Sequence, residues 1–167
     1  MKTSFNADEI LKIAEQLEKN GVTFYKVAAL KVSNPHINKL LSDLASWEEA
    51  HEKTLARMRA VLKENVQGEK TFDAQDKSSL HLQMLFGGNL FDLKTDPIEL
   101  INDNTTIEDV LQVAVKKEKD SVIFYLSLKN LLTNRVDQKI IDKIIDEEMD
   151  HITFLNKEIT TLHHQFM

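Results

Sequence analysis

The feature that most constrains the fold is a repeat that relates the two halves of the chain at a shift of 100 residues. The repeated residues recur at the three- and four-residue spacing that places side chains on one face of a helix. In the first pair of segments, the matches are Leu11, Ala14, Glu18, Val22, Phe24 and Tyr25 with Leu111, Ala114, Glu118, Val122, Phe124 and Tyr125. In the second pair, they are Leu41, Leu44, Glu48, His51, Leu55 and Leu62 with Ile141, Ile144, Glu148, His151, Leu155 and Leu162. The repeat predicts two similar helical hairpins related by a pseudo-twofold axis.

The apolar period predicts four long helices, which cover residues 7–32, 34–67, 105–133 and 134–162. Polar residues suited to N-capping precede them, namely Asn6, Asn34, Thr105 and Asn134. Thr105 is followed three residues later by Glu108, which is the spacing of a capping box. The chain contains only four glycines and two prolines, as expected for long helices. Because the links within each pair are short, each pair should form an antiparallel hairpin.

Residues 68–104 connect the two hairpins and are too numerous for an ordinary loop. Ser78 to Phe86 reads as a short helix that ends at Gly87. We expect this crossover to run along the bundle, covering its side with Leu82, Leu85, Phe86 and Phe91. The prediction is therefore an all-α four-helix bundle of two hairpins joined by a long crossover, forming one domain over residues 1–167. Its internal repeat comprises residues 7–67 and 105–165.

Charge and composition exclude several classes of function. The formal net charge is −6, and no run of Lys and Arg offers a surface for nucleic acid. We find no apolar stretch near the roughly 20 residues that span a membrane, and no signal-peptide pattern. We therefore expect a cytoplasmic protein without a membrane or nucleic-acid partner. The chain contains no cysteine, so disulfides, Cys-ligated zinc and iron–sulfur or rubredoxin-type iron centres cannot form within it.

Six polar side chains interrupt the apolar faces of the predicted helices. Each helix carries one glutamate midway along its apolar face, and two of these glutamates are followed three residues later by a histidine. We call these six residues the Glu/His cluster: Glu18, Glu48, His51, Glu118, Glu148 and His151. A buried carboxylate costs several kcal/mol unless it is paired or protonated. Two divalent cations would neutralise four carboxylates, and two neutral imidazoles would complete the coordination.

Helical bundles that bind two iron or manganese ions use the same residue types. Their ligands are one Glu from each of two helices and Glu-x-x-His from each of the other two. A single Glu-x-x-His is usually a solvated pair, but the duplication here favours a metal site. We expect the neighbouring Glu49 and Glu147 to face solvent, although a helix rotated by one position would exchange Glu147 for Glu148. Trp47 is expected to serve packing.

Other polar and aromatic residues leave alternatives open. Tyr25 and Tyr125 lie two helical turns beyond Glu18 and Glu118 on the same faces. Their hydroxyls could bond to the metal-binding carboxylates, or they could be core aromatics that find some other partner. The remaining histidines have no symmetric partner, and we expect them on the surface: His36, His81, His163 and His164.

In these segments the chain resembles the rubrerythrin-like branch of the ferritin-like superfamily. The segments are LEKNGVTFY, LASWEEAHEKTL, VKKEKDSVIFY and IIDEEMDHITFL. The resemblance implies two iron ions at the middle of the bundle, although manganese and zinc also accept such ligands. It further implies that Glu18 and Glu118 are terminal ligands, that Glu48 and Glu148 bridge the metals, and that each histidine binds one metal.

The resemblance also implies a function, with two departures. It implies a non-haem di-iron oxidoreductase that reacts with hydrogen peroxide or dioxygen and commonly forms a homodimer. Rubrerythrins carry a Cys-ligated domain that supplies electrons, so this chain would need an external electron donor. They also carry an extra Glu where this sequence has Ser121 (Gly21 in the first half), which puts peroxidase-type chemistry in question. The alternatives are an iron-binding, ferroxidase or storage protein without small-molecule turnover, and a bundle with structural zinc.

Overall fold

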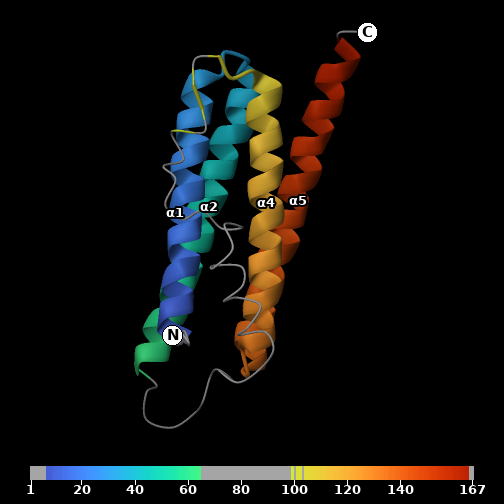
Figure 1. Cartoon of the computed structure of the whole chain (residues 1–167). Coiled ribbons are helices and arrows are strands. Elements are labelled where there is room, and N and C mark those ends of the chain that lie inside the picture. Colours follow the sequence, from blue (N-terminus) through green and yellow to red (C-terminus); the bar gives the residue numbers. More distant parts are fainter. Residues whose placement is uncertain (1–6, 65–98, 100, 103, 166–167) are drawn as a thin grey trace, which may run out of the picture.

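The protein is a bundle of four long helices (Figure 1). The computed structural model describes residues 7–64, 99, 101–102 and 104–165. The helices are α1 (Ala7–Lys31), α2 (Pro35–Glu64), α4 (Ile107–Leu131) and α5 (Arg135–Gln165). The predicted all-α four-helix bundle is confirmed. The short helix expected at residues 78–86, the apolar side chains expected to cover the bundle and His81 lie outside the described residues.

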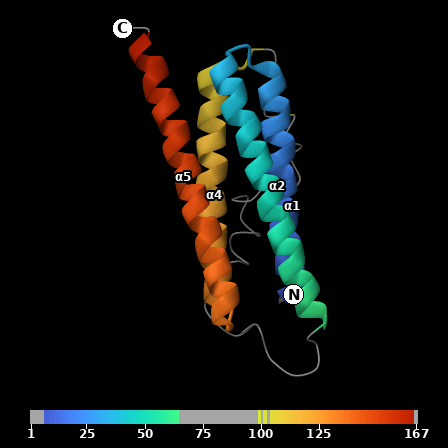
Figure 2. The ribbon, with the colours of Figure 1, turned by 180° about the vertical axis from the view of Figure 1, so that it is seen from behind.

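The helices are arranged as two antiparallel hairpins. α1 packs mainly against α2, and α4 packs mainly against α5, whereas contacts between the two pairs are far fewer. Figures 1 and 2 show the two pairs side by side, with the C-terminal end of α5 leaning away from the other helices. Residues of the two hairpins also meet in the buried apolar interior, on both sides of the middle of the bundle.

Side-chain caps begin three of the helices. Asn34 accepts hydrogen bonds from the backbone N–H groups of two residues of α2, and Asn134 accepts one from the backbone N–H of Val136 in α5. The predicted cap of α4 is wrong by one residue, because Thr106 is the N-cap. The hydroxyl of Thr106 accepts a hydrogen bond from the backbone N–H of Asp109 at 3.1 Å. In return, the carboxylate of Asp109 accepts a hydrogen bond from the backbone N–H of Thr106 at 2.9 Å. The hydroxyl of Thr105 instead accepts from the backbone of Asn102.

The buried apolar residues form two cores, one on each side of the Glu/His cluster along the bundle. One core includes Phe24, Tyr25, Leu41, Leu44, Leu111 and Leu155. The other includes Leu11, Leu55, Phe124, Tyr125, Leu128 and Ile141. On every helix, the cluster residues fall between those two groups in the sequence. The polar residues are thus held at the middle of the bundle, shielded from water at both ends.

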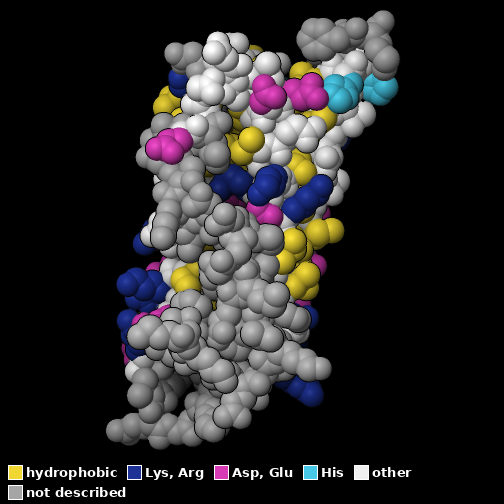
Figure 3. Space-filling view, in the orientation of Figure 1, with side chains coloured by type: hydrophobic (Ala, Val, Ile, Leu, Met, Phe, Trp, Pro, Cys, Tyr) yellow, Lys and Arg dark blue, Asp and Glu magenta, His cyan; other side chains and the backbone are white. Residues whose placement is uncertain are grey.

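The surface of the described helices is mixed in character. On the face shown in Figure 3, acidic, basic and hydrophobic side chains are interspersed. Among the described helices, none contains a stretch long and apolar enough to cross a membrane.

The cap of α4 gives a test of the local structure. Replacing Thr106 by alanine removes the oxygen that accepts from Asp109, and we expect a loss of about 1 kcal/mol in the free energy of unfolding. Thermal unfolding monitored by circular dichroism should show a decrease of about 2–4 °C in Tm. Thr106→Ser retains the oxygen and should unfold like the parent. An unchanged Tm for Thr106→Ala would contradict this assignment of the cap.

Candidate metal centre

The six side chains of the Glu/His cluster meet inside the bundle. Glu18 comes from α1, Glu48 and His51 from α2, Glu118 from α4, and Glu148 and His151 from α5. None of the six exposes more than 3% of its surface. The inward orientation predicted for all six residues is therefore present, and Glu148 rather than Glu147 occupies the interior.

Two groups of potential metal-binding atoms overlap within this cluster. One group comprises Glu18, Glu48, His51 and Glu148, each of which offers one nitrogen or oxygen atom within 4.8 Å of the atoms offered by the others. The other comprises Glu48, Glu118, Glu148 and His151, under the same limit. Glu48 and Glu148 belong to both groups, and each group has its own histidine and its own second glutamate. The arrangement thus offers two adjacent positions that share two carboxylates.

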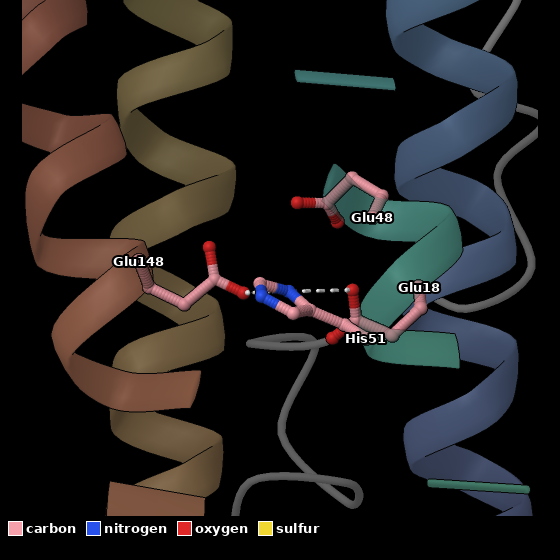
Figure 4. A group of neighbouring side chains, drawn as sticks. All are labelled: Glu18, Glu48, His51 and Glu148. Carbon is pink, nitrogen blue, oxygen red and sulfur yellow. Dashed lines mark ion pairs between the residues drawn. The ribbon is translucent and has the colours of Figure 1, made fainter. Parts of the chain in front are cut away.

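The contacts of Glu148 show how one carboxylate serves both positions. Its Oε1 lies 3.2 Å from Nδ1 of His51, and its Oε2 lies 3.0 Å from Nδ1 of His151. Nδ1 of His51 also lies 3.6 Å from Oε2 of Glu18. Figure 4 shows the ring of His51 between Glu18 and Glu148, with Glu48 nearby. The two imidazole rings are 5.9 Å apart, centroid to centroid.

Several polar atoms of the cluster are buried without a hydrogen bond. Within the described part of the chain these are Oε2 of Glu18, Oε1 of Glu48, Nδ1 of His51 and Oε1 of Glu148. A buried polar atom without a partner is costly, and such atoms are uncommon in folded proteins. All four are oxygen or nitrogen atoms that can donate an electron pair to a metal ion. Because they lie close together in the cluster, they fit a divalent cation. Carboxylate and imidazole donors suit iron, manganese and zinc. That these six residues bind metal remains a prediction.

Burial and mutual repulsion perturb the carboxylates of the metal-free cluster. Burial raises the pKa of Glu48 well above its usual range, and the charges of Glu18 and Glu148 add to this effect. Burial and the charge of Glu118 raise the pKa of Glu148 to about 8. For Glu118, burial acts in the same direction, but the hydrogen bonds to His151, Glu148 and Tyr25 and the charge of His151 together outweigh it and lower the pKa. The carboxylates therefore share protons unequally.

The histidines respond to the surrounding carboxylates. Burial lowers the pKa of His51, but Glu148 and Glu18 outweigh burial and raise the pKa to about 11. In the same way, Glu118 and Glu148 raise the pKa of His151 to about 9. At neutral pH the metal-free cluster thus retains protons that offset part of its negative charge.

The two buried tyrosines connect the hairpins at the cluster. The hydroxyl of Tyr25 on α1 donates a hydrogen bond to Glu118 on α4, and that of Tyr125 on α4 donates to Glu18 on α1. Burial, together with the charge of the glutamate that each contacts, raises the pKa of both tyrosines well above the usual range. Each hydroxyl therefore keeps its proton and holds one carboxylate oxygen in place.

Two residues outside the predicted set contact the histidines. Oε2 of Glu147 lies 2.9 Å from Nε2 of His51, on the side of the ring away from the cluster, so Glu147 is not simply solvent-facing. Trp47 stacks on His151 with ring centroids 4.9 Å apart and planes 10° from parallel. In the sequence, the only signal for the contact of Glu147 with His51 is that Glu147 directly precedes the Glu148-x-x-His151 motif. That position does not reveal a contact with another helix.

His36 and His163 are exposed, as expected, and pair with Glu158 and Glu108.

Gly21 provides the space that Glu48 occupies. A Cβ placed on Gly21 would clash sterically with Oε2 of Glu48 and would lie 3.1 Å from its Cδ. The equivalent position in the second hairpin is Ser121, which is buried. The absence of a side chain at residue 21 thus lets one shared carboxylate approach α1.

Comparisons with known proteins agree with this geometry. Residues 9–82 match the family model for rubrerythrin. A crystal structure from Thermotoga maritima, of a protein named as ferritin-like and diiron-carboxylate, is 26% identical with a TM-score of 0.68, covering 96% of this chain and 98% of that one. A hypothetical protein from Pyrococcus furiosus, 19% identical with a TM-score of 0.69, covers 98% of this chain and 94% of its own and shares the fold. No curated protein matches the chain.

A four-helix bundle with carboxylate and imidazole groups converging at its middle defines the class of ferritin-like proteins. Over residues 9–82, which are fewer than half of the chain, the sequence is similar to the rubrerythrins of that class. The Glu/His cluster and the likeness together suggest a di-iron type of protein.

Gly21 allows the geometry of the shared carboxylate to be tested. Gly21→Ala should displace the carboxylate of Glu48 and weaken the binding of Mn²⁺ at both positions, on the order of tenfold or more. The helix itself should tolerate alanine, which favours helix formation by about 1 kcal/mol over glycine. Ser121→Ala is the matched control, and calorimetric titration is the measurement. Equal Mn²⁺ affinities for both variants and the parent would contradict this role for Gly21.

The pKa values predict that metal binding releases protons. Glu148, His51 and His151 have pKa values of about 8, 11 and 9 in the metal-free protein, so all three are largely protonated at neutral pH. A bound cation requires them without these protons, so Mn²⁺ affinity should rise as the pH increases from about 6 to about 8. Calorimetry in two buffers with different ionisation enthalpies should show net proton release. Affinity that does not change over this range would contradict the prediction.

Proposed function

We propose that the protein is a non-haem di-iron oxidoreductase that reacts with hydrogen peroxide or dioxygen at a carboxylate-bridged dinuclear site. The observation that supports this proposal most is the overlap of two four-residue groups through Glu48 and Glu148. Two isolated metal sites would not need shared carboxylates, whereas a dinuclear site does. The likeness to a ferritin-like diiron-carboxylate protein supports iron as the metal.

In this proposal the chain's own residues have distinct roles. Glu18 and His51 hold one metal position, Glu118 and His151 hold the other, and Glu48 and Glu148 lie between them. Tyr25 and Tyr125 orient the outer carboxylates by donating a hydrogen bond to one oxygen of each. The other oxygen of Glu18, Oε2, lies 3.6 Å from Nδ1 of His51, whereas Oε1 of Glu118 contacts both Tyr25 and, at 3.8 Å, Nδ1 of His151.

The surroundings of the cluster suit a reaction with a small, uncharged oxidant. Two ferrous ions, when bound, would each supply one electron for the two-electron reduction of an O–O bond. The apolar cores on both sides exclude water from the bundle interior, which strengthens the electrostatic interactions within the cluster. Because the chain has no cysteine, we propose that electrons come from an external donor.

The experiment is oxidation of the ferrous-loaded protein. Protein loaded with Fe²⁺ under anaerobic conditions should be oxidised by added peroxide or dioxygen faster than free Fe²⁺, as followed by absorbance. Glu148→Ala removes the carboxylate that contacts both histidines and should abolish this acceleration. Glu49→Ala is the matched control, because Glu49 pairs with Lys26 at 2.6 Å outside the cluster.

The same experiment separates this proposal from iron storage. If neither the parent protein nor Glu148→Ala oxidises Fe²⁺ faster than free Fe²⁺ is oxidised, the oxidoreductase is ruled out. Growth of an iron core in a larger assembly on adding excess Fe²⁺ would favour storage, whereas binding that stops at two ions per chain would favour the oxidoreductase. Redox-silent metal in protein from its native host would instead point to a structural site.

A further inference from the structure

The pseudo-twofold symmetry of the metal centre breaks at one pair of residues. The shift of 100 residues that relates the hairpins pairs Glu147 with Trp47. Each of these residues contacts the histidine of the other hairpin, Glu147 at Nε2 of His51 and Trp47 at one face of the His151 ring. His51 therefore has a carboxylate as its outer neighbour, whereas His151 has an indole ring.

The two histidines present the same atom to the cluster. Nδ1 of His51 faces Glu148 and Glu18 at 3.2 and 3.6 Å. Nδ1 of His151 faces Glu148 and Glu118 at 3.0 and 3.8 Å. As potential ligands the two rings are thus equivalent, and they differ only in what contacts the rest of each ring.

Glu147 is well placed to act on His51 as a hydrogen-bond acceptor. Its Oε2 is 2.9 Å from Nε2 of His51, and its Oε1 is 3.4 Å from Nζ of Lys143 one turn earlier on α5. A carboxylate that accepts a hydrogen bond from one ring nitrogen fixes the proton on that nitrogen. The other ring nitrogen is then free to bind metal, and it becomes a stronger metal ligand.

Trp47 gives His151 no such acceptor. Its indole covers one face of the imidazole ring and also packs near Phe154, with a centroid separation of 6.2 Å. An indole nitrogen can only donate a hydrogen bond. Among the residues that the structure describes, none accepts a hydrogen bond from Nε2 of His151. Stacking therefore orients the ring without strengthening it as a ligand.

We propose that the two metal positions are unequal, and that the position formed with Glu18 and His51 binds a divalent cation more tightly than the position formed with Glu118 and His151. Glu147 is the positioning residue that causes the difference. This inference rests on the proposed dinuclear site and adds an order of loading. The first cation enters the position next to His51, and the second enters the position next to His151.

The test is a titration of the full chain with Mn²⁺, followed by calorimetry and by electron paramagnetic resonance, which distinguishes single from coupled Mn²⁺ ions. At one equivalent, the parent should contain mostly single ions. Glu147→Gln should weaken the first binding step about 10- to 100-fold and leave the second step nearly unchanged. Glu158→Gln is the matched control, because it removes a carboxylate of α5 that pairs with the exposed His36 at 3.0 Å.

A second variant tests the inference by gain of function. Trp47→Glu places a carboxylate at the position symmetric to Glu147 and should tighten the second step alone. Trp47→Gln also removes the indole but adds no carboxylate, so comparing it with Trp47→Glu isolates the effect of the carboxylate on the second step. Circular dichroism checks that each variant is folded, and the Trp47 series keeps the inference testable if Glu147→Gln is unstable.

The outcomes separate this inference from the proposed function. Two ions that bind in equal steps to the parent, or a Glu147→Gln variant that behaves like Glu158→Gln, would overturn the inequality and leave the dinuclear site intact. A Trp47→Glu variant that tightens both steps alike would also overturn it, because a general charge effect would then account for the change. Failure of the parent to bind Mn²⁺ in the cluster would overturn the proposed function, and the inference with it.

Discussion

The structure depends on one electrostatic constraint, which is that four carboxylates lie in the dry middle of the bundle. Each unpaired buried carboxylate would cost several kcal/mol, whereas the whole stability of a domain is about 5–15 kcal/mol. The metal-free protein meets the constraint with protons on the cluster and with two tyrosine hydroxyls. Two divalent cations would meet it more completely, because their charge equals that of the four carboxylates. Fold and proposed function are therefore two consequences of the same set of side chains.

The cluster adds polar contacts between the two hairpins, which also share both apolar cores. Each group of potential ligands takes three residues from one hairpin and one shared carboxylate from the other, Glu148 in the first group and Glu48 in the second. The tyrosine hydrogen bonds and the contact between His51 and Glu147 also cross between the hairpins. A metal bound in either position would link the hairpins at mid-length. Loading with metal should thus change the rigidity of the bundle as well as its chemistry.

Helical periodicity and the internal repeat were sufficient to predict the four helices and the inward orientation of all six cluster residues. Both signals report which face of a helix is buried, and burial decides the position of residues such as Glu18 and Glu148. They do not report how one helix is rotated against a helix of the other hairpin. For that reason the sequence does not predict the contact of Glu147 with His51. Within one hairpin, periodicity also does not predict how closely α2 approaches α1, so the dependence of Glu48 on Gly21 is visible only in the structure. The shift from Thr105 to Thr106 has a local cause, because both residues can cap and only the backbone conformation distinguishes them.

The most direct test of the account is anomalous X-ray scattering at the iron absorption edge from crystals of the iron-loaded protein. We predict two peaks per chain inside the bundle. One should be bound by Glu18 and Nδ1 of His51, the other by Glu118 and Nδ1 of His151, and both by Glu48 and Glu148. Iron found only at surface residues, or a Glu/His cluster that stays free of iron at saturating concentration, would contradict the claim that these buried carboxylates exist to hold cations.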